Sequence, residues 1–352
     1  MRERADGSRL RDWVLLSGDR WVLAAAVLAV YGLGVLVVAT FLPGQAIVDL
    51  GDPIETLFQA LVTATITGVT LVVSINSLVL SQELGPLGDQ RDRMAGAMSF
   101  RRDVEDELET GVTAATPAEF LHELVTAAGD RARTLSAAAE TAVGTDGVDQ
   151  VTTYAAELER HADTTASALS GAQFGSFGVV SAALNFNYSW KIHEARRLRA
   201  AFEPAAASDN GSTPNPSGRP PAEREVLEAF DDIVSVLLLY GAAREHVKTL
   251  YFQWDLVDLS RAMLYTAVPS LVVATNVLLF HGVLGTFSAT TLGIAHYVWI
   301  VTVASTVALA PFAILLSFVL RIGTVAKRTL SIGPLILRAT DATTADRTDA
   351  EK

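Results

Sequence analysis

Residues 262–320 read AMLYTAVPSLVVATNVLLFHGVLGTFSATTLGIAHYVWIVTVASTVALAPFAILLSFVL and contain no Asp, Glu, Lys or Arg. A helix that crosses the hydrocarbon core of a bilayer needs about 20 apolar residues at a rise of about 1.5 Å each. This stretch is too long for one such helix, and Gly285, Gly293 and several Ser and Thr residues lie near its middle. It therefore predicts a membrane-embedded helical hairpin with arms at 263–284 and 297–320, each containing one kink-forming proline.

Two earlier stretches, 21–48 and 56–82, also lack charged residues. They predict transmembrane helices over 21–42 and 56–82. The first apolar stretch is too long for the hydrophobic part of a cleaved signal peptide, so we expect it to be retained. The sequence thus predicts an all-α integral membrane protein with four transmembrane helices and a helical cytoplasmic insertion between helices 2 and 3. The predicted segments are 1–20 (cytoplasmic), 21–86 (helices 1 and 2), 87–262 (cytoplasmic domain), 263–321 (helices 3 and 4) and 322–352 (cytoplasmic tail).

The orientation follows from the distribution of Lys and Arg, which concentrate on the cytoplasmic side of membrane proteins. Basic residues flank the predicted helices at the N-terminal segment, after helix 2, before helix 3 and after helix 4, whereas the loops at 43–55 and 285–296 have none. We therefore predict a multi-pass protein of the cell membrane with both termini in the cytoplasm.

The charge of the protein lies in the insertion. Residues 83–262 contain 28 acidic and 16 basic residues, which accounts for the net charge of −12 of the whole chain. Arg outnumbers Lys by 23 to 4. An acidic, Lys-poor chain suits a cytoplasm of very high salt, where a Debye length of about 3 Å at 1 M weakens repulsion between carboxylates. The alternative is a high-GC organism of ordinary salinity.

The insertion is predicted to be helical over about 117–143, 148–170, 179–202 and from about 222 onward. Thr116 and Glu119 form a capping box around Pro117. Residues 204–221 have five prolines and no large apolar residue, so we predict a disordered loop there. The last of these helices has no breaker before Pro269, which allows it to continue into the third transmembrane helix.

Several classes of site are absent from the sequence. There is no cysteine, the six histidines have no metal-ligand spacing, and no nucleotide-binding or nucleophile motif is present. We therefore predict no catalytic residue, no metal, no cofactor and no enzymatic activity. The basic cluster Lys191, Arg196, Arg197 and Arg199 is interpreted as a solvated face, with contact to lipid headgroups as the alternative; nucleic acid is not expected as a partner of so acidic a domain.

The second predicted helix carries the candidate site. At 100° per residue, all its positions within about 40° of Thr63 are polar, and they extend for about 38 Å along the helix. In one interpretation, this stripe lines a pore formed by several copies of the chain, and Asp49, Asp52 and Glu55 lie at the outer mouth. In the others, it packs against neighbouring helices or lines a buried ligand groove. The stripe residues are Thr56, Gln59, Thr63, Thr67, Thr70, Ser74, Ser77 and Ser81.

The stretch SINSLVLSQELGPLGDQRDRM (Ser74–Met94), within an acidic and Arg-rich chain, resembles an uncharacterised group of multi-pass membrane proteins from halophilic archaea. That resemblance implies habitat and topology only. The plan of two spans, a helical insertion and two further spans is also loosely similar to bestrophin-type channels, although the pores of that family are narrowed by apolar residues.

Three functions remain open from the sequence. The first is an oligomeric ion channel or passive solute pathway in the lipid bilayer. The second is a membrane-anchored scaffold or sensor whose cytoplasmic domain binds a protein partner. The third, an enzyme, lacks a supporting group of residues.

Overall fold

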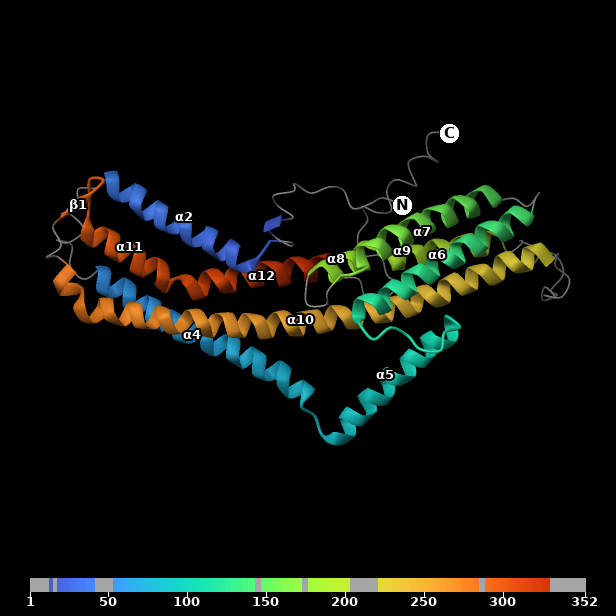
Figure 1. Ribbon diagram of the computed structural model, residues 1–352, viewed down its shortest axis with the longest axis horizontal. Helices are drawn as coiled ribbons and strands as arrows, with labels where there is room; N and C mark the ends of the chain where they lie inside the picture. The colour runs from blue at the N-terminus through green and yellow to red at the C-terminus, as the bar shows by residue number, and fades with distance from the viewer. Residues whose placement is uncertain are drawn as a thin grey trace. The chain divides into compact units, whose positions relative to one another are not determined.

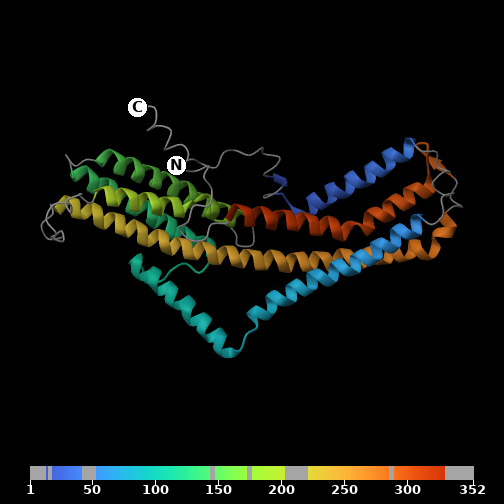
Figure 2. The same cartoon turned by 180° about the vertical axis from the view of Figure 1, so that it is seen from behind.

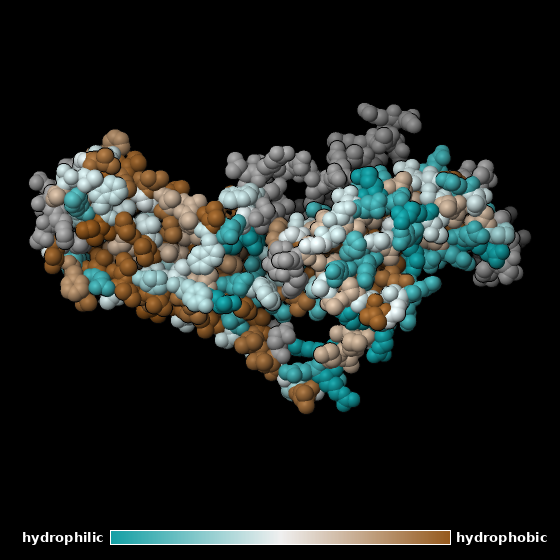
Figure 3. Space-filling model, in the orientation of Figure 1, coloured by the Kyte–Doolittle hydropathy of each residue, from teal (hydrophilic) through white to brown (hydrophobic). Residues whose placement is uncertain are grey.

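The computed structural model describes residues 13–14, 18–41, 53–142, 147–172, 177–202, 221–284 and 289–329. These residues are mostly helical, which confirms the all-α prediction. The chain divides into two compact units. We call the unit built on Leu87–Tyr251 the polar unit, and we call the unit of Gly7–Pro86 and Phe252–Arg328 the apolar unit. The helices are labelled in Figure 1 and seen from behind in Figure 2, and Figure 3 shows hydrophobic side chains gathered over α2, α4 and α11.

Helices of the apolar unit are long and hydrophobic enough to cross a membrane. Three qualify among the described residues, within α2 (Arg20–Phe41), α4 (Pro53–Glu83) and α10 (Pro221–Leu284). The pair α11 (His296–Ala308) and α12 (Ala310–Thr329) provides a fourth if it forms one bent span. The structure thus supports association with a membrane.

Small residues bring the helices of the apolar unit together. Phe58 and Leu61 of α4 pack against Ala274 of α10 and against Ala304 and Ala308 of α11. Alanine allows membrane helices to approach closely, where dispersion contacts replace the hydrophobic effect as the main source of stability. A second cluster joins α2, α4, α10 and α12 through Ala24, Val72, Met263 and Ile314.

The fourth predicted arm is broken into two helices. We predicted one helix over 297–320, but α11 and α12 meet at Leu309 with a bend of 42°. The cause is Pro311, which has no N–H to donate to the carbonyl of Val307 four residues earlier. The Ser270 hydroxyl of α10 lies 2.7 Å from that carbonyl and 2.7 Å from the Thr266 carbonyl of its own helix, so its single proton can serve either acceptor, and Ser270 is itself buried. The bend is therefore stabilised from a neighbouring helix.

Replacing Ser270 with Ala is expected to destabilise the apolar unit by about 1–2 kcal/mol, because the Val307 carbonyl loses a buried partner. Ser260→Ala is the matched control, since Ser260 is also buried on α10 but donates only to Leu256 within its own helix. Denaturation of both variants in detergent would measure the difference. Equal losses of stability in the two variants would contradict the assigned role of Ser270.

A tight hairpin precedes α11. Strands β1 (Thr290–Thr291) and β2 (Ile294–Ala295) pair antiparallel, and Leu292 and Gly293 between them have φ values of 55° and 77°. Positive φ at both central residues is typical of a type I′ turn, whose twist matches that of the flanking strands. The predicted turn at 285–296 therefore contains a short strand pair that no sequence pattern indicated.

The polar unit contains α5 (Leu87–Glu107), α6 (Pro117–Thr141), α7 (Val148–Leu169), α8 (Phe177–Asn185), α9 (Tyr188–Phe202) and the first part of α10. Helices α6 and α7 lie side by side (Figures 1 and 2). The cap predicted before α6 is confirmed: the Thr116 hydroxyl accepts a hydrogen bond from the Glu119 backbone N–H at 3.3 Å and donates to the Glu119 carboxylate at 2.9 Å. The core is built from buried side chains of these helices, including Leu121, Leu124, Leu158, Phe230 and Ile233.

Two helix boundaries in this unit differ from those predicted from the sequence. The helix predicted over 179–202 is two helices. The Asn187 side chain accepts a hydrogen bond from the Trp190 N–H at 3.4 Å and so caps the N-terminus of a separate helix, α9. Pro221, predicted as the end of the disordered loop, is the first residue of α10. The rest of that loop lies outside the described residues. Helix α10 then continues without a break to Leu284, as predicted.

Candidate functional site

The hydroxyl stripe of α4 faces away from the packed interior of the apolar unit. Its eight residues, from Thr56 to Ser81, are all exposed. The buried residues of the same helix lie on the opposite side, and they are Phe58, Leu61, Thr65, Gly68 and Val72. Among the described residues, the helices of this unit therefore leave the stripe uncovered.

The stripe hydroxyls donate to the backbone of their own helix. Thr67 donates to the Thr63 carbonyl at 2.8 Å and Ser74 to the Thr70 carbonyl at 2.7 Å, and Thr70 and Ser81 make equivalent bonds. Each hydroxyl oxygen keeps lone pairs that point away from this bond, so the exposed face offers hydrogen-bond acceptors.

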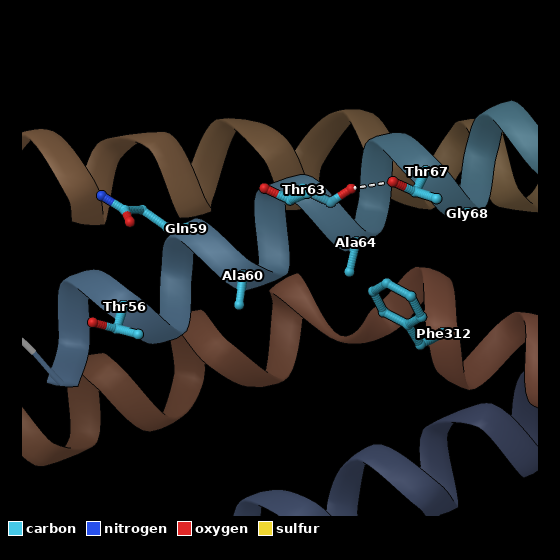
Figure 4. A pocket seen from close by; sticks show the side chains of 8 residues that line it. All are labelled: Thr56, Gln59, Ala60, Thr63, Ala64, Thr67, Gly68 and Phe312. Atoms are coloured by element: carbon cyan, nitrogen blue, oxygen red, sulfur yellow. Dashed lines mark hydrogen bonds between the residues drawn. The ribbon is translucent and has the colours of Figure 1, made fainter.

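An open groove of about 720 Å³ runs along one half of the stripe (Figure 4). Thr56, Gln59, Thr63 and Thr67 form one side of it. The rest of the lining is apolar, and comes from Ala60, Ala64, Gly68 and the ring of Phe312 on α12. A polar edge beside small residues therefore forms a concave surface on α4.

The predicted outer mouth is described only in part. Glu55 lies in the first turn of α4, where its carboxylate accepts a hydrogen bond from the Gln59 amide at 3.0 Å. Asp49 and Asp52 lie outside the described residues. The structure thus links Glu55 directly to Gln59 of the stripe.

The sequence profile of a family of unknown function, DUF7972, matches residues 1–350. The chain belongs to the DUF7972 family. No curated protein and no solved structure matches it. The archaeal source and the similarity to bestrophin-type channels therefore stay predictions.

The apolar unit of this DUF7972 chain also holds a buried charged cluster, which we define as Arg20, Asp255 and Arg321. An Arg321 guanidinium nitrogen lies 3.8 Å from the Asp255 carboxylate. Arg20 donates to the Ser317 carbonyl at 3.2 Å and Arg321 to the Gly18 carbonyl at 3.1 Å. The cluster joins the first residue of α2 to the middle of α10 and to the second half of α12. In the sequence, Arg20 and Arg321 are two of the basic residues that flank predicted helices, and no local pattern indicates that they meet Asp255.

A buried lysine lies in the polar unit. Lys191 is 2% exposed, and its ammonium lies 3.1 Å from the Nδ1 atom of His161 and 4.7 Å from the centre of the Phe186 ring. Burial lowers the pKa of Lys191 to about 8, against an opposing attraction from Glu157. Burial and the Lys191 charge lower the pKa of His161 to about 4, so a neutral imidazole can accept a hydrogen bond from the ammonium.

The prediction that this basic cluster is a solvated face is therefore wrong for Lys191, which is buried. It is correct for Arg196 and Arg197, which are exposed. Arg197 pairs with Glu194 at 2.6 Å, and Arg199 pairs with Asp231 of α10 at 2.8 Å. Within the described part of the chain, no group of three or more His, Asp or Glu side chains could hold a metal ion.

Proposed function

We propose that the protein is an oligomeric passive pathway for ions or small solutes, lined by the hydroxyl stripe of α4. In this proposal the apolar unit spans the membrane four times, with α11 and α12 as one bent span, and the polar unit and both termini lie in the cytoplasm. The Lys and Arg distribution of the sequence supports that orientation.

The exposure of the stripe is the observation that supports a pathway. A surface that faces lipid gains nothing from hydroxyl groups, and α2 of the same unit illustrates this. The large exposed side chains of α2 are all hydrophobic: Trp21, Val22, Val27, Val30, Leu33, Val37, Val38 and Phe41. By contrast, α4 exposes eight polar residues in one narrow arc. Water or a second polar surface suits that arc better than lipid tails do.

One chain cannot enclose a path with this stripe, because the stripe lies on the outer surface of its unit. Several copies around an axis would bring their α4 helices together and surround a water-filled space. Hydroxyl oxygens can then replace part of the hydration shell of a passing ion without adding fixed charge.

Flux through liposomes tests the proposal. We would measure the release of K⁺, Cl⁻ and a small neutral solute from vesicles that hold the purified full-length chain, in about 1 M KCl to suit so acidic a polar unit. The test variant changes Thr63, Thr67, Thr70 and Ser74 to Val. We expect flux in the wild type and a fall of about tenfold or more in the variant, because each valine removes an acceptor from the path.

The matched control is a quadruple variant of α4 outside the stripe, in which Ile66, Leu71, Ile75 and Leu78 become Val. These four residues are also exposed, so the control should retain wild-type flux. Circular dichroism and thermal denaturation would establish that both variants are folded. Absence of flux in the wild type, or equal flux in all three proteins, would refute the pathway.

A membrane-anchored scaffold is the second candidate, and α5 favours it. Residues 87–99 of this helix are all exposed within the structure. Leu87, Met94 and Met98 share one face of α5 and are 82%, 66% and 45% exposed. Exposed methionine and leucine on one helix face suit the binding of a partner helix. If the protein is such a scaffold, substitutions on this face of α5, rather than in the stripe, would impair the binding of the partner helix.

A further inference from the structure

One side of helix α5 combines apolar side chains with arginines. At 100° per residue, positions 87, 91, 94, 98 and 102 lie within an arc of about 80°. They are Leu87, Arg91, Met94, Met98 and Arg102, and all five are exposed. We call these five residues the α5 row.

The other sides of α5 differ from this row in chemistry and in packing. Asp89, Asp92 and Asp103 lie within about 60° of one another on the side opposite the row, and they are exposed. Val104 belongs to the core of the polar unit, and Phe100 packs against that core. Helix α5 is therefore held to its unit by its C-terminal half, while the arginines of the row and the aspartates point in opposite directions.

The start of α5 is tied closely to the end of α4, because only residues 84–86 join them. The 31 residues of α4 reach about 46 Å at a rise of about 1.5 Å, which matches a bilayer of about 40–45 Å with both headgroup layers. In the proposed spanning arrangement, the C-terminal end of α4 then lies among the headgroups of the inner leaflet. Covalent geometry keeps Leu87 within about 14 Å of that end, so α5 begins at the membrane surface.

We propose that α5 lies on the inner leaflet with the α5 row against the lipid, and that its two arginines bind anionic headgroups. Leucine and methionine enter the boundary between headgroups and acyl chains, as the apolar face of an interfacial helix does. The arginine stems extend along the same surface, and their guanidinium groups reach the lipid phosphates. The aspartates stay in water on the far side. The proposal rests on the proposed spanning arrangement, but not on conduction.

A partner helix, which the scaffold candidate requires, suits the α5 row less well than lipid does. A helix that docks in an apolar groove presents apolar anchors at i, i+3 or i+4, and i+7. In this row Arg91 stands between Leu87 and Met94, and Arg102 comes after Met98. An apolar partner would bury both charges at a cost, whereas a headgroup layer offers them phosphate and water.

Single cysteines can report which side of α5 faces lipid. The chain contains no cysteine, so each variant carries one thiol for a fluorescent label. Met94→Cys and Met98→Cys place the label on the α5 row. Asp92→Cys and Gly96→Cys are the matched controls, because both positions are exposed at similar heights on the opposite side, and a side chain at Gly96 would meet nothing within 4 Å.

The labelled full chain is placed in vesicles of phosphatidylglycerol and phosphatidylcholine with brominated acyl chains, with iodide in the water on both sides. We expect the brominated lipid to quench the labels on the α5 row, which iodide should not reach. We expect the reverse for the two controls. Circular dichroism would establish that every labelled variant is folded.

The arginines are tested in the Met98→Cys background. Arg91→Gln and Arg102→Gln should each shift the equilibrium between bound and released α5 about fivefold toward release in vesicles that contain phosphatidylglycerol. This shift lowers quenching by brominated lipid at residue 98. Arg93→Gln is the matched control, because Arg93 is exposed on the same helix but outside the row. Equal quenching in the three variants would rule out the headgroup contact.

Two further results would overturn the proposal. Protection of the row labels from both quenchers would mean that protein covers the row, and iodide quenching of row and control labels alike would mean that the row faces water. Leu33→Cys separates these results from failure of the spanning arrangement, because Leu33 is 62% exposed on α2 and should be quenched by brominated lipid. Lipid quenching at residue 33 but not at 98 refutes the α5 proposal alone, whereas its absence at 33 refutes the spanning arrangement as well.

Discussion

Replacing Asp255 with Ala is expected to destabilise the apolar unit by about 3 kcal/mol or more, because the change leaves the charges of Arg20 and Arg321 buried without their shared carboxylate. Asp255 is 5% exposed and Arg20 is 4% exposed, so water does not readily replace the lost partner. The charged cluster joins three helices that are far apart in the sequence, and its loss should loosen all three together.

Denaturation of the purified protein in detergent would measure this effect. Asp258→Ala is the matched control, because Asp258 is exposed on the same helix one turn away, and it should change the free energy of unfolding by less than about 0.5 kcal/mol. If Asp255→Ala were no more destabilising than Asp258→Ala, the charged cluster would not stabilise the apolar unit.

Replacing Lys191 with Met is expected to stabilise the polar unit by about 3 kcal/mol at pH 7. Burial lowers the pKa of Lys191 from 10.5 to about 8, which means that its charge is less favourable in the folded protein than in water. The attraction to Glu157 already opposes this shift, so the net effect of the charge is destabilising. Methionine fills a similar volume without a charge.

The pH dependence of stability gives the same prediction a second readout. Between pH 8 and 10.5 the unfolded chain binds a proton at Lys191 that the folded chain does not bind, so stability rises with pH across this window. The difference in stability between Lys191→Met and the wild type should therefore be greatest below pH 8 and disappear by about pH 10.5. Arg196→Met, an exposed cation on the same helix, should show no such change. A constant difference across the window would contradict a buried ammonium.

Local signals in the sequence predicted much of this fold. Charge-free stretches located the apolar helices, and the capping box at Thr116 located the start of α6 to the residue. The arc on α4 also follows from helix geometry alone, because residues that share a phase share a face. Whether that face lines a pathway stays a prediction.

The features that were missed depend on contacts between distant segments. The break at Asn187 was hidden because apolar residues continue on both sides of it. Lys191 resembles its basic neighbours in sequence, and only the positions of Phe186 and His161 around it reveal that it is buried. The charged cluster likewise joins residues more than 60 positions apart. Sequence patterns report which face of a helix is polar, but not which charges another helix will cover.

The bond from Ser270 to the Val307 carbonyl also restricts the order in which substitutions can accumulate in this family. An N–H donor at position 311 would supply the Val307 carbonyl with a partner in its own helix, whereas with Pro311 that carbonyl is bonded by the Ser270 hydroxyl and the Leu309 N–H. Loss of Ser270 would therefore be almost neutral before proline arose and harmful afterwards, so the two positions should not vary independently. Among relatives of this chain, small apolar residues at 270 should accompany residues other than proline at 311.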